Sequence, residues 1–218
     1  MLKQAVTKVD ILNDKDYDKI VTPVSSLAII TTVDAQGRPN AATFGTVVRN
    51  CHYPTCFEFS VDTYKDTWNN VVATGEFVIN VPSCEPWLLE KVVTVGLDFA
   101  PGVNELEKAG LTALPSTIVK APRVLECKSH FECKVEWTKN WIGTRCIVVG
   151  RVVAASIDSD CIDERGRAII ERLRPAHSCG GTFGLNRFVE AYKVIEVPIV
   201  YEGTDYKRNR NAKEQEKS

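Results

Sequence analysis

Residues 26–48 read SLAIITTVDAQGRPNAATFGTVV, and this run predicts the β-hairpin around which the rest of the chain can be assigned. Its first arm, 26–33, is rich in β-branched residues, which favour strands. The turn formers of 34–37 follow it, before Arg38-Pro39. We therefore expect residues 40–48, NAATFGTVV, to return as the second strand.

Further strands and short helices are expected downstream of this hairpin. A loop at 50–55 leads to a third strand at 56–61, and a helix begins near Asp66 and ends at Gly75. The alternating run EFVINV then predicts a strand at 76–81. The later elements are two helices within 85–93 and 103–109, an extended segment at 111–122, and strands at 130–138 and 145–157 joined by 139–143.

This element order predicts a mainly β (α+β) architecture with a few short helices. Many short strands favour a barrel or sandwich over a doubly wound sheet. One domain is expected over residues 1–201, because no linker or repeat interrupts it. The segment 202–218 carries many charges and almost no apolar residues, so we expect a disordered tail.

The composition argues against several classes of partner. The 218 residues include 44% hydrophobic and 25% charged residues, with a formal net charge of −1. Nucleic acids and anionic membranes favour a cationic surface, so we expect neither as a partner. The sequence has no apolar run of about 20 residues and begins without the apolar centre of a secretion signal, which predicts a cytoplasmic location.

Two segments carry residues suited to flavin mononucleotide (FMN). Ser60, Thr63, Lys65 and Thr67 place hydroxyl groups and a cation at a helix start, where a phosphate dianion is bound well. The alternative is that Thr63 only caps the helix and the others are surface residues.

The second segment is 40–46, NAATFGT, which is small and polar where a buried strand is usually bulky. Such residues let a planar ring lie against backbone N–H groups. The equal alternative is a strand packed closely against a neighbour, with a bulge at Gly45.

Three longer stretches resemble the flavin reductase-like family of FMN-binding split barrels, nearest its flavoredoxin branch. They are PVSSLAIITTVDAQGRPNAATFGTV at 23–47, SVDTYKDTWNNVVATGEFVINVPS at 60–83 and GLTALPSTIVKAPRVLECKSHFECKVE at 110–136. The most specific parts are TGEFVINVPS and the pair KAPRVLEC and ECKV. The likeness extends from about residue 23 to about residue 197.

The resemblance implies a split β-barrel homodimer with FMN near the subunit interface. It places Asn40, Ala42, Thr43, Phe44 and Gly45 beside the flavin ring. It places Ser60, Thr63, Lys65 and Thr67 at the phosphate end of the cofactor. Asp66 departs from the family pattern, and because a carboxylate near a phosphate is unfavourable, we expect it to point away.

A late segment, RPAHSCGG at 174–181, resembles the family's His-x-x-Gly-Gly loop, which approaches the flavin or the opposite subunit. His177 is therefore a candidate cofactor-binding residue, although a single histidine is often structural. The eight cysteines are interpreted as thiols, with Cys133 and Cys146 as buried small residues. Cys51-His52 and Cys56 lack a second closely spaced ligand pair, so no metal site is predicted.

The function expected from these features is an FMN-dependent oxidoreductase. NAD(P)H would reduce the flavin, which would pass electrons to a free flavin or a redox protein. No side chain is required as an acid or base, so no catalytic residue is assigned. The alternatives are a non-enzymatic flavoredoxin-type carrier that retains its FMN, and a barrel that binds another small ligand.

Overall fold

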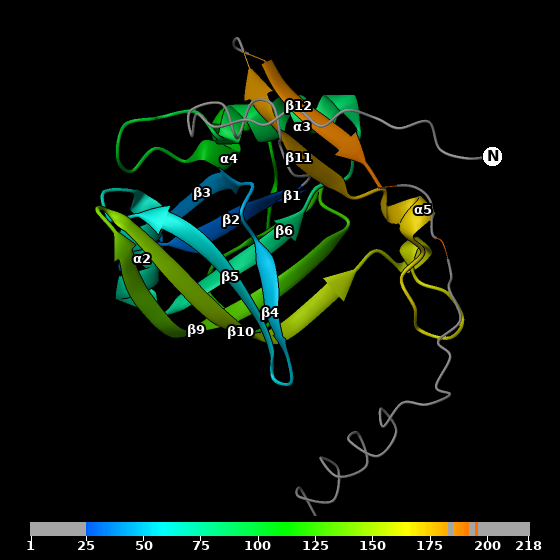
Figure 1. Cartoon of the computed structure of the whole chain (residues 1–218), viewed down its shortest axis with the longest axis horizontal. Helices are drawn as coiled ribbons and strands as arrows, with labels where there is room; N and C mark the ends of the chain where they lie inside the picture. The colour runs from blue at the N-terminus through cyan, green and yellow to red at the C-terminus, as the bar shows by residue number, and fades with distance from the viewer. Residues whose placement is uncertain (1–24, 183–184, 192–194, 196–218) are drawn as a thin grey trace, which may run out of the picture.

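A long antiparallel hairpin, β9 (Ser129–Ile142) and β10 (Arg145–Ile157), lies at the centre of the main sheet (Figure 1). The computed structural model describes residues 25–182, 185–191 and 195. The seven-stranded sheet has the order β3-β2-β6-β9-β10-β5-β4, and every pairing in it is antiparallel. Its other strands are β2 (Ala28–Val33), β3 (Pro39–Phe44), β4 (Val48–His52), β5 (Thr55–Asp62) and β6 (Glu76–Val81).

The sheet curls around an apolar core to which strands from both of its halves contribute (Figure 1). Phe59 of β5 and Phe77 of β6 meet edge to face, with their ring centroids 5.2 Å apart. Ile30 of β2 and Val148 of β10 are fully buried in the same cluster. Because alternate residues point to opposite faces of a strand, this core takes one side chain in two from each strand.

A second core lies between β2 and two helices, α3 (Pro86–Val95) and α4 (Glu105–Ala109). Ile29 of β2 and Val92 of α3 are fully buried in it. All six residues of β2 are therefore buried, which explains why five of the six are β-branched and none is charged.

The helix α2 (Asp66–Thr74) connects β5 to β6 and ends as the sequence predicts. Gly75 adopts a left-handed φ of 69°, and its N–H donates to the carbonyl of Val71. A glycine is favoured here because it has no Cβ to oppose a positive φ.

Smaller elements cover the remaining surface. A three-stranded sheet contains β1 (Ser25–Ser26), β11 (Ala176–Thr182) and β12 (Leu185–Glu190), and β7 (Ala113–Leu114) pairs with β8 (Arg123–Val124). A 3₁₀ helix, η1 (Ser159–Cys161), and α5 (Ile170–Leu173) link β10 to β11. Within the described ranges, the helices are all too short or too polar to cross a membrane.

The structure corrects four of the expected elements or boundaries. The expected second arm, 40–48, breaks after Phe44. The first half of the expected loop at 50–55 belongs to β4, because this strand pairs with β5. The expected strand at 130–138 continues to Ile142. The expected loop at 174–181 is largely strand β11, whose backbone pairs with β1 and β12. The expected tail, 202–218, lies outside the described residues.

Candidate functional site

A cavity of about 460 Å³ lies where the end of β3, the end of β5 and the first turn of α2 meet the loop after α3. Its volume falls within the range of small-molecule sites. Its lining combines backbone and small side chains of 40–46, the polar turn that follows β5, and residues 95–101. An elongated ligand with one apolar and one anionic end would match this lining.

The β3 side of the cavity is held by a buried carboxylate. Glu105 of α4 accepts a hydrogen bond from the backbone N–H of Ala41 at 2.9 Å and from the Asn40 amide nitrogen at 3.0 Å. Burial raises the pKa of Glu105 above its usual range, although these hydrogen bonds oppose that shift. Glu105 therefore fixes the start of β3 against α4.

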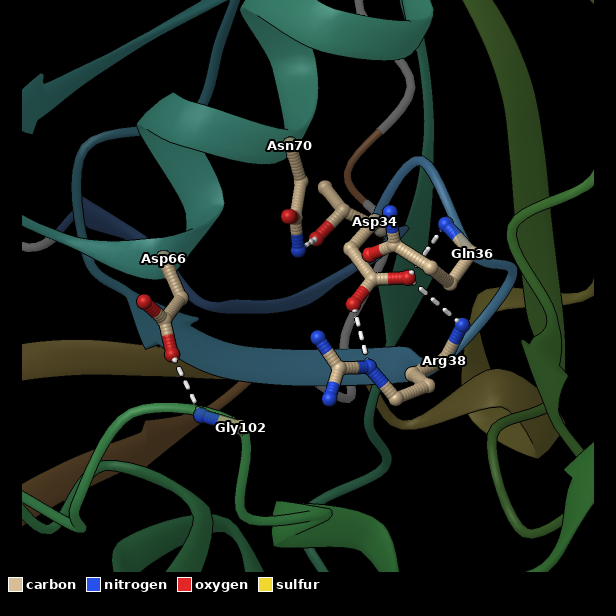
Figure 2. Close-up of polar contacts among 7 residues, drawn as sticks. Asp34, Gln36, Arg38, Asp66, Asn70 and Gly102 are labelled. Atoms are coloured by element: carbon tan, nitrogen blue, oxygen red, sulfur yellow. Dashed lines mark hydrogen bonds and ion pairs between the residues drawn. The ribbon is translucent and has the colours of Figure 1, made fainter.

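Asn40 also joins β3 to its other neighbours. Its amide oxygen accepts from the hydroxyl of Thr32 at 3.1 Å and from the hydroxyl of Thr67 at 3.3 Å. The Asn70 amide donates to the Thr32 hydroxyl at 3.0 Å (Figure 2). The side chains of Asn40 and Thr67 are thus part of a buried network that aligns β2, β3 and α2.

The first turn of α2 is available to an anion. The helix begins at Asp66 with Lys65 as its N-cap, and no side chain caps it. The Trp68 N–H already donates to the carbonyl of Lys65 at 3.0 Å, so Asp66 and Thr67 are the first-turn residues whose N–H groups have no partner within the helix. Such N–H groups bind anions readily. Thr63 does not cap the helix as the sequence suggested, and its backbone N–H donates to the carbonyl of Thr144 at 2.9 Å.

Asp66 also lines the cavity, and its carboxylate is bonded to the loop that follows α3. Its carboxylate accepts from the backbone N–H of Gly102 at 3.1 Å (Figure 2). This bond ties the loop after α3 to the first turn of α2. The loop is therefore held at the cavity edge from both of its ends, by Val95 of α3 and by Asp66.

Two cations line the cavity, and each forms an ion pair. Lys65 bonds to Asp98, and that hydrogen bond raises the pKa of Lys65. A guanidinium nitrogen of Arg145 lies 3.1 Å from a carboxylate oxygen of Asp62. The other carboxylate oxygen of Asp62 accepts a hydrogen bond from the hydroxyl of Thr144 at 2.8 Å. Asp98 is 87% exposed at its side chain, so a bound anion can displace it at little cost.

The donors of this site fit the phosphate of FMN. Lys65, Arg145 and the uncapped first turn of α2 supply cations and N–H groups on one wall. Three of the four lining carboxylates are already bound to Arg145, to Gly102 or to the start of β3. Only Asp98 must move, and it lies on an exposed loop.

Comparison with known proteins identifies the fold. A family model described as "Flavin reductase like domain" matches residues 22–173, which is more than half of the chain. This chain belongs to the flavin reductase-like family. An uncharacterized protein of Aquifex aeolicus is 32% identical over 191 residues, covering 83% of this chain and 96% of its own length.

Two solved structures show the same architecture as this flavin reductase-like chain. A split-barrel protein of Shewanella frigidimarina, assigned to the flavin reductases, matches with a TM-score of 0.76 and 19% identity over 87% of this chain and 94% of its own. Flavoredoxin from Methanosarcina acetivorans matches with a TM-score of 0.69 and 20% identity over 93% of this chain and all of its own. The predicted family and split-barrel fold are thus confirmed.

The structure brings most of the predicted cofactor residues of this family member to one cavity. Those lining it are Asn40, Ala42, Thr43, Phe44, Gly45, Ser60, Lys65 and Thr67. Thr63 is not part of this lining. His177 lies on β11 and lines a separate hollow of about 310 Å³ with Arg49 and Phe131. Within one chain, His177 therefore does not join the predicted site.

The sequence interpretation missed Glu105, Arg145 and the six lining residues within 95–101. Glu105 is 65 positions from Asn40, and no local motif connects them. Arg145 follows a turn whose sequence predicts only a hairpin. The sequence did offer one signal for Glu105, because a carboxylate at the start of a predicted helix is a candidate for an internal hydrogen bond.

Proposed function

We propose that this chain binds FMN in the β3–α2 cavity and acts as an NAD(P)H-dependent, flavin reductase-like oxidoreductase. One observation carries the proposal. In a chain of this family, the cavity joins an uncapped helix N-terminus with Lys65 to a strand end of small residues. This arrangement suits a ligand with a dianionic end and a flat ring.

In this proposal, the residues of the cavity bind and orient the cofactor. Lys65, Arg145 and the first N–H groups of α2 hold the phosphate. The backbone of residues 42–45 lies along the ring, and Glu105 and Asn40 keep that backbone in place. When bound, FMN supplies the hydride and electron-transfer chemistry.

The proposed electron donor is NAD(P)H, and the acceptor is a free flavin or a redox protein. The test is anaerobic mixing of the purified protein with FMN and either NADH or NADPH, followed through the flavin absorbance. Catalytic bleaching supports the reductase. If the protein retains FMN through dialysis but shows no NAD(P)H turnover, the reductase proposal is wrong and a flavoredoxin-type carrier is supported instead.

The phosphate position can be tested with one pair of variants and two ligands. Lys65→Met removes a cavity cation, whereas Lys134→Met removes a comparably exposed lysine that lies 3.9 Å from Glu76 on the sheet. A charge-assisted contact contributes about 1.5–3 kcal/mol, so K65M should weaken FMN binding about 10–100-fold. Riboflavin lacks the phosphate, and its affinity should be the same for K65M, K134M and the unmodified protein. Equal loss for both ligands would refute the assigned phosphate position.

We also propose a homodimer whose interface adjoins the cavity. Trp141 and Ile142, at the end of β9, are each 69% exposed. Ile142 is paired with Arg145, a residue that lines the cavity. Exposed apolar side chains of this size favour a protein contact. Sedimentation of the protein should give a dimer, and Trp141→Glu should give a monomer with weaker FMN binding.

A further inference from the structure

The hairpin of β4 and β5 contains two cysteines in directly opposite positions. Cys51 of β4 is paired with Cys56 of β5, and Tyr53-Pro54 forms the turn between them. Opposite residues of antiparallel strands have Cα atoms about 4.5 or about 5.5 Å apart, depending on the type of pair. Both separations fall within the range that a disulfide spans without backbone movement.

No other cysteine in the paired strands of the described chain has this relation to a second cysteine. Cys133 of β9 lies opposite Phe77 and Val152, and Cys146 of β10 lies opposite Val61 and Asn140. Both of these thiols are buried. Cys133 packs in the apolar core, and the Cys146 thiol donates to the side-chain oxygen of Asn140 at 2.9 Å. The opposite placement therefore distinguishes Cys51 and Cys56 from the other strand cysteines.

We propose that Cys51 and Cys56 form a reversible disulfide by exchange with a low-molecular-weight disulfide such as oxidised glutathione. The two protein thiols are oxidised to one disulfide, and the reagent is reduced to two thiols. Protons from the protein thiols pass to the solvent and the leaving thiolates. The site does not depend on a bound flavin, so this proposal is independent of the proposed function.

The exposure of the two sulfur groups sets the order of the steps. Cys51 is partly exposed and its thiolate attacks the reagent disulfide, which forms a mixed disulfide and releases one reagent thiolate. Cys56 is buried, and its thiolate then attacks the Cys51 sulfur and releases the second reagent thiolate. Burial, followed by the charge of Cys51, raises the pKa of Cys56, so less of this thiol is ionised and it is not the first to attack the reagent.

The disulfide would act on the sheet edge rather than on the cavity directly. β4 is the last strand of the seven-stranded sheet and pairs only with β5 among its strands. Cys56 and Ser60 are four residues apart on β5, which separates them by about 13 Å along the strand. The bond would fix β4 to β5 and leave the cavity residues in place.

The test uses the full chain and a single proteolytic fragment. Trypsin releases residues 50–65, which contain Cys51 and Cys56 and no other cysteine. The protein is equilibrated with mixtures of reduced and oxidised glutathione, free thiols are blocked with N-ethylmaleimide, and this fragment is analysed by mass spectrometry. The expected product is lighter than the reduced fragment by two hydrogen atoms and carries no maleimide.

Variants and a reference peptide make the result decisive. Cys56→Ser should stop at a glutathione adduct on Cys51, and Cys84→Ser, which changes a partly exposed cysteine outside the pair, should leave the disulfide unaffected. The equilibrium constant for oxidation should be at least about tenfold higher in the folded protein than in synthetic peptide 50–65, because the strands hold the thiols together. The proposal is overturned if the two constants are equal, or if the native protein gives only glutathione adducts.

Discussion

Replacement of Glu132 by glutamine should destabilise the protein through a single buried carboxylate. Glu132 of β9 is 2% exposed and accepts backbone hydrogen bonds from Thr117 at 2.8 Å, Ile118 at 2.7 Å and Val119 at 3.2 Å. Glutamine keeps one acceptor oxygen and turns an NH₂ group toward at least one of these donors. One unsatisfied donor plus the loss of charge assistance costs about 3 kcal/mol.

The size and pH dependence of this loss can be measured by thermal and urea unfolding. For a chain of this length, about 3 kcal/mol corresponds to a Tm decrease of about 6–12 °C. Burial acts to raise the pKa of Glu132, but the three N–H donors outweigh it and the net pKa is lowered. A carboxylate with a lowered folded-state pKa contributes stability above its unfolded pKa and loses it as pH falls through the folded one. The difference from E132Q should therefore be full at pH 7 and shrink in acid.

The matched control is Glu90→Gln, which changes an exposed glutamate on α3. It should leave the Tm within about 1–2 °C of the unmodified protein, as surface substitutions usually do. A Tm decrease for E132Q no larger than that of the control would refute the carboxylate's assigned role. A decrease of the same size at every pH would refute the assigned charge.

Three further substitutions test the site and the core. Asp98→Asn frees Lys65 from its exposed ion pair, so calorimetry should show that FMN binds about 2–5-fold more tightly. Weaker binding would contradict the proposed role of Lys65. Glu105→Gln should cost less than about 1 kcal/mol at pH 7, because burial raises the pKa of Glu105 and makes its ionised form costly. Relative to the unmodified protein, this variant should gain stability from pH 4 to 7, the opposite of E132Q, and a falling curve would contradict the raised pKa. Gly150→Ala places a Cβ 2.4 Å from the Phe77 ring and should cost about 1–3 kcal/mol in urea unfolding, whereas Gly45→Ala meets its neighbours at an ordinary 3.6 Å and should not.

Local patterns predicted the elements whose signals lie within a few neighbouring residues. The hairpin of β2 and β3 has turn residues between two strand-forming runs, and α2 ends at a glycine that adopts a positive φ. The strand β11 was misassigned because residues 174–181 were matched to the family's His-x-x-Gly-Gly loop. Its pairing partners are more than 140 residues away at β1 and a few residues ahead at β12, and the first of these gives no local signal.

The candidate site divides in the same way between local and distant residues. Segments 40–46 and 60–67 were identified from their own composition, and all but Thr63 of the residues chosen from them line one cavity. Asn40 and Thr67 were expected to contact the ligand, yet their side chains bond to each other within the buried network. Composition indicates that a polar residue is needed and does not show which neighbour satisfies it.

The cavity walls are joined before any ligand arrives. One amide, that of Asn40, connects a helix start, two strands and a second helix, and Asp66 ties the adjoining loop to the same helix. A ligand that enters this cavity does not have to order its walls, so little conformational entropy is lost on association. Tight binding is then attainable with few direct contacts. Substitutions that weaken this hydrogen-bond network should lower the affinity even at positions that do not contact the ligand.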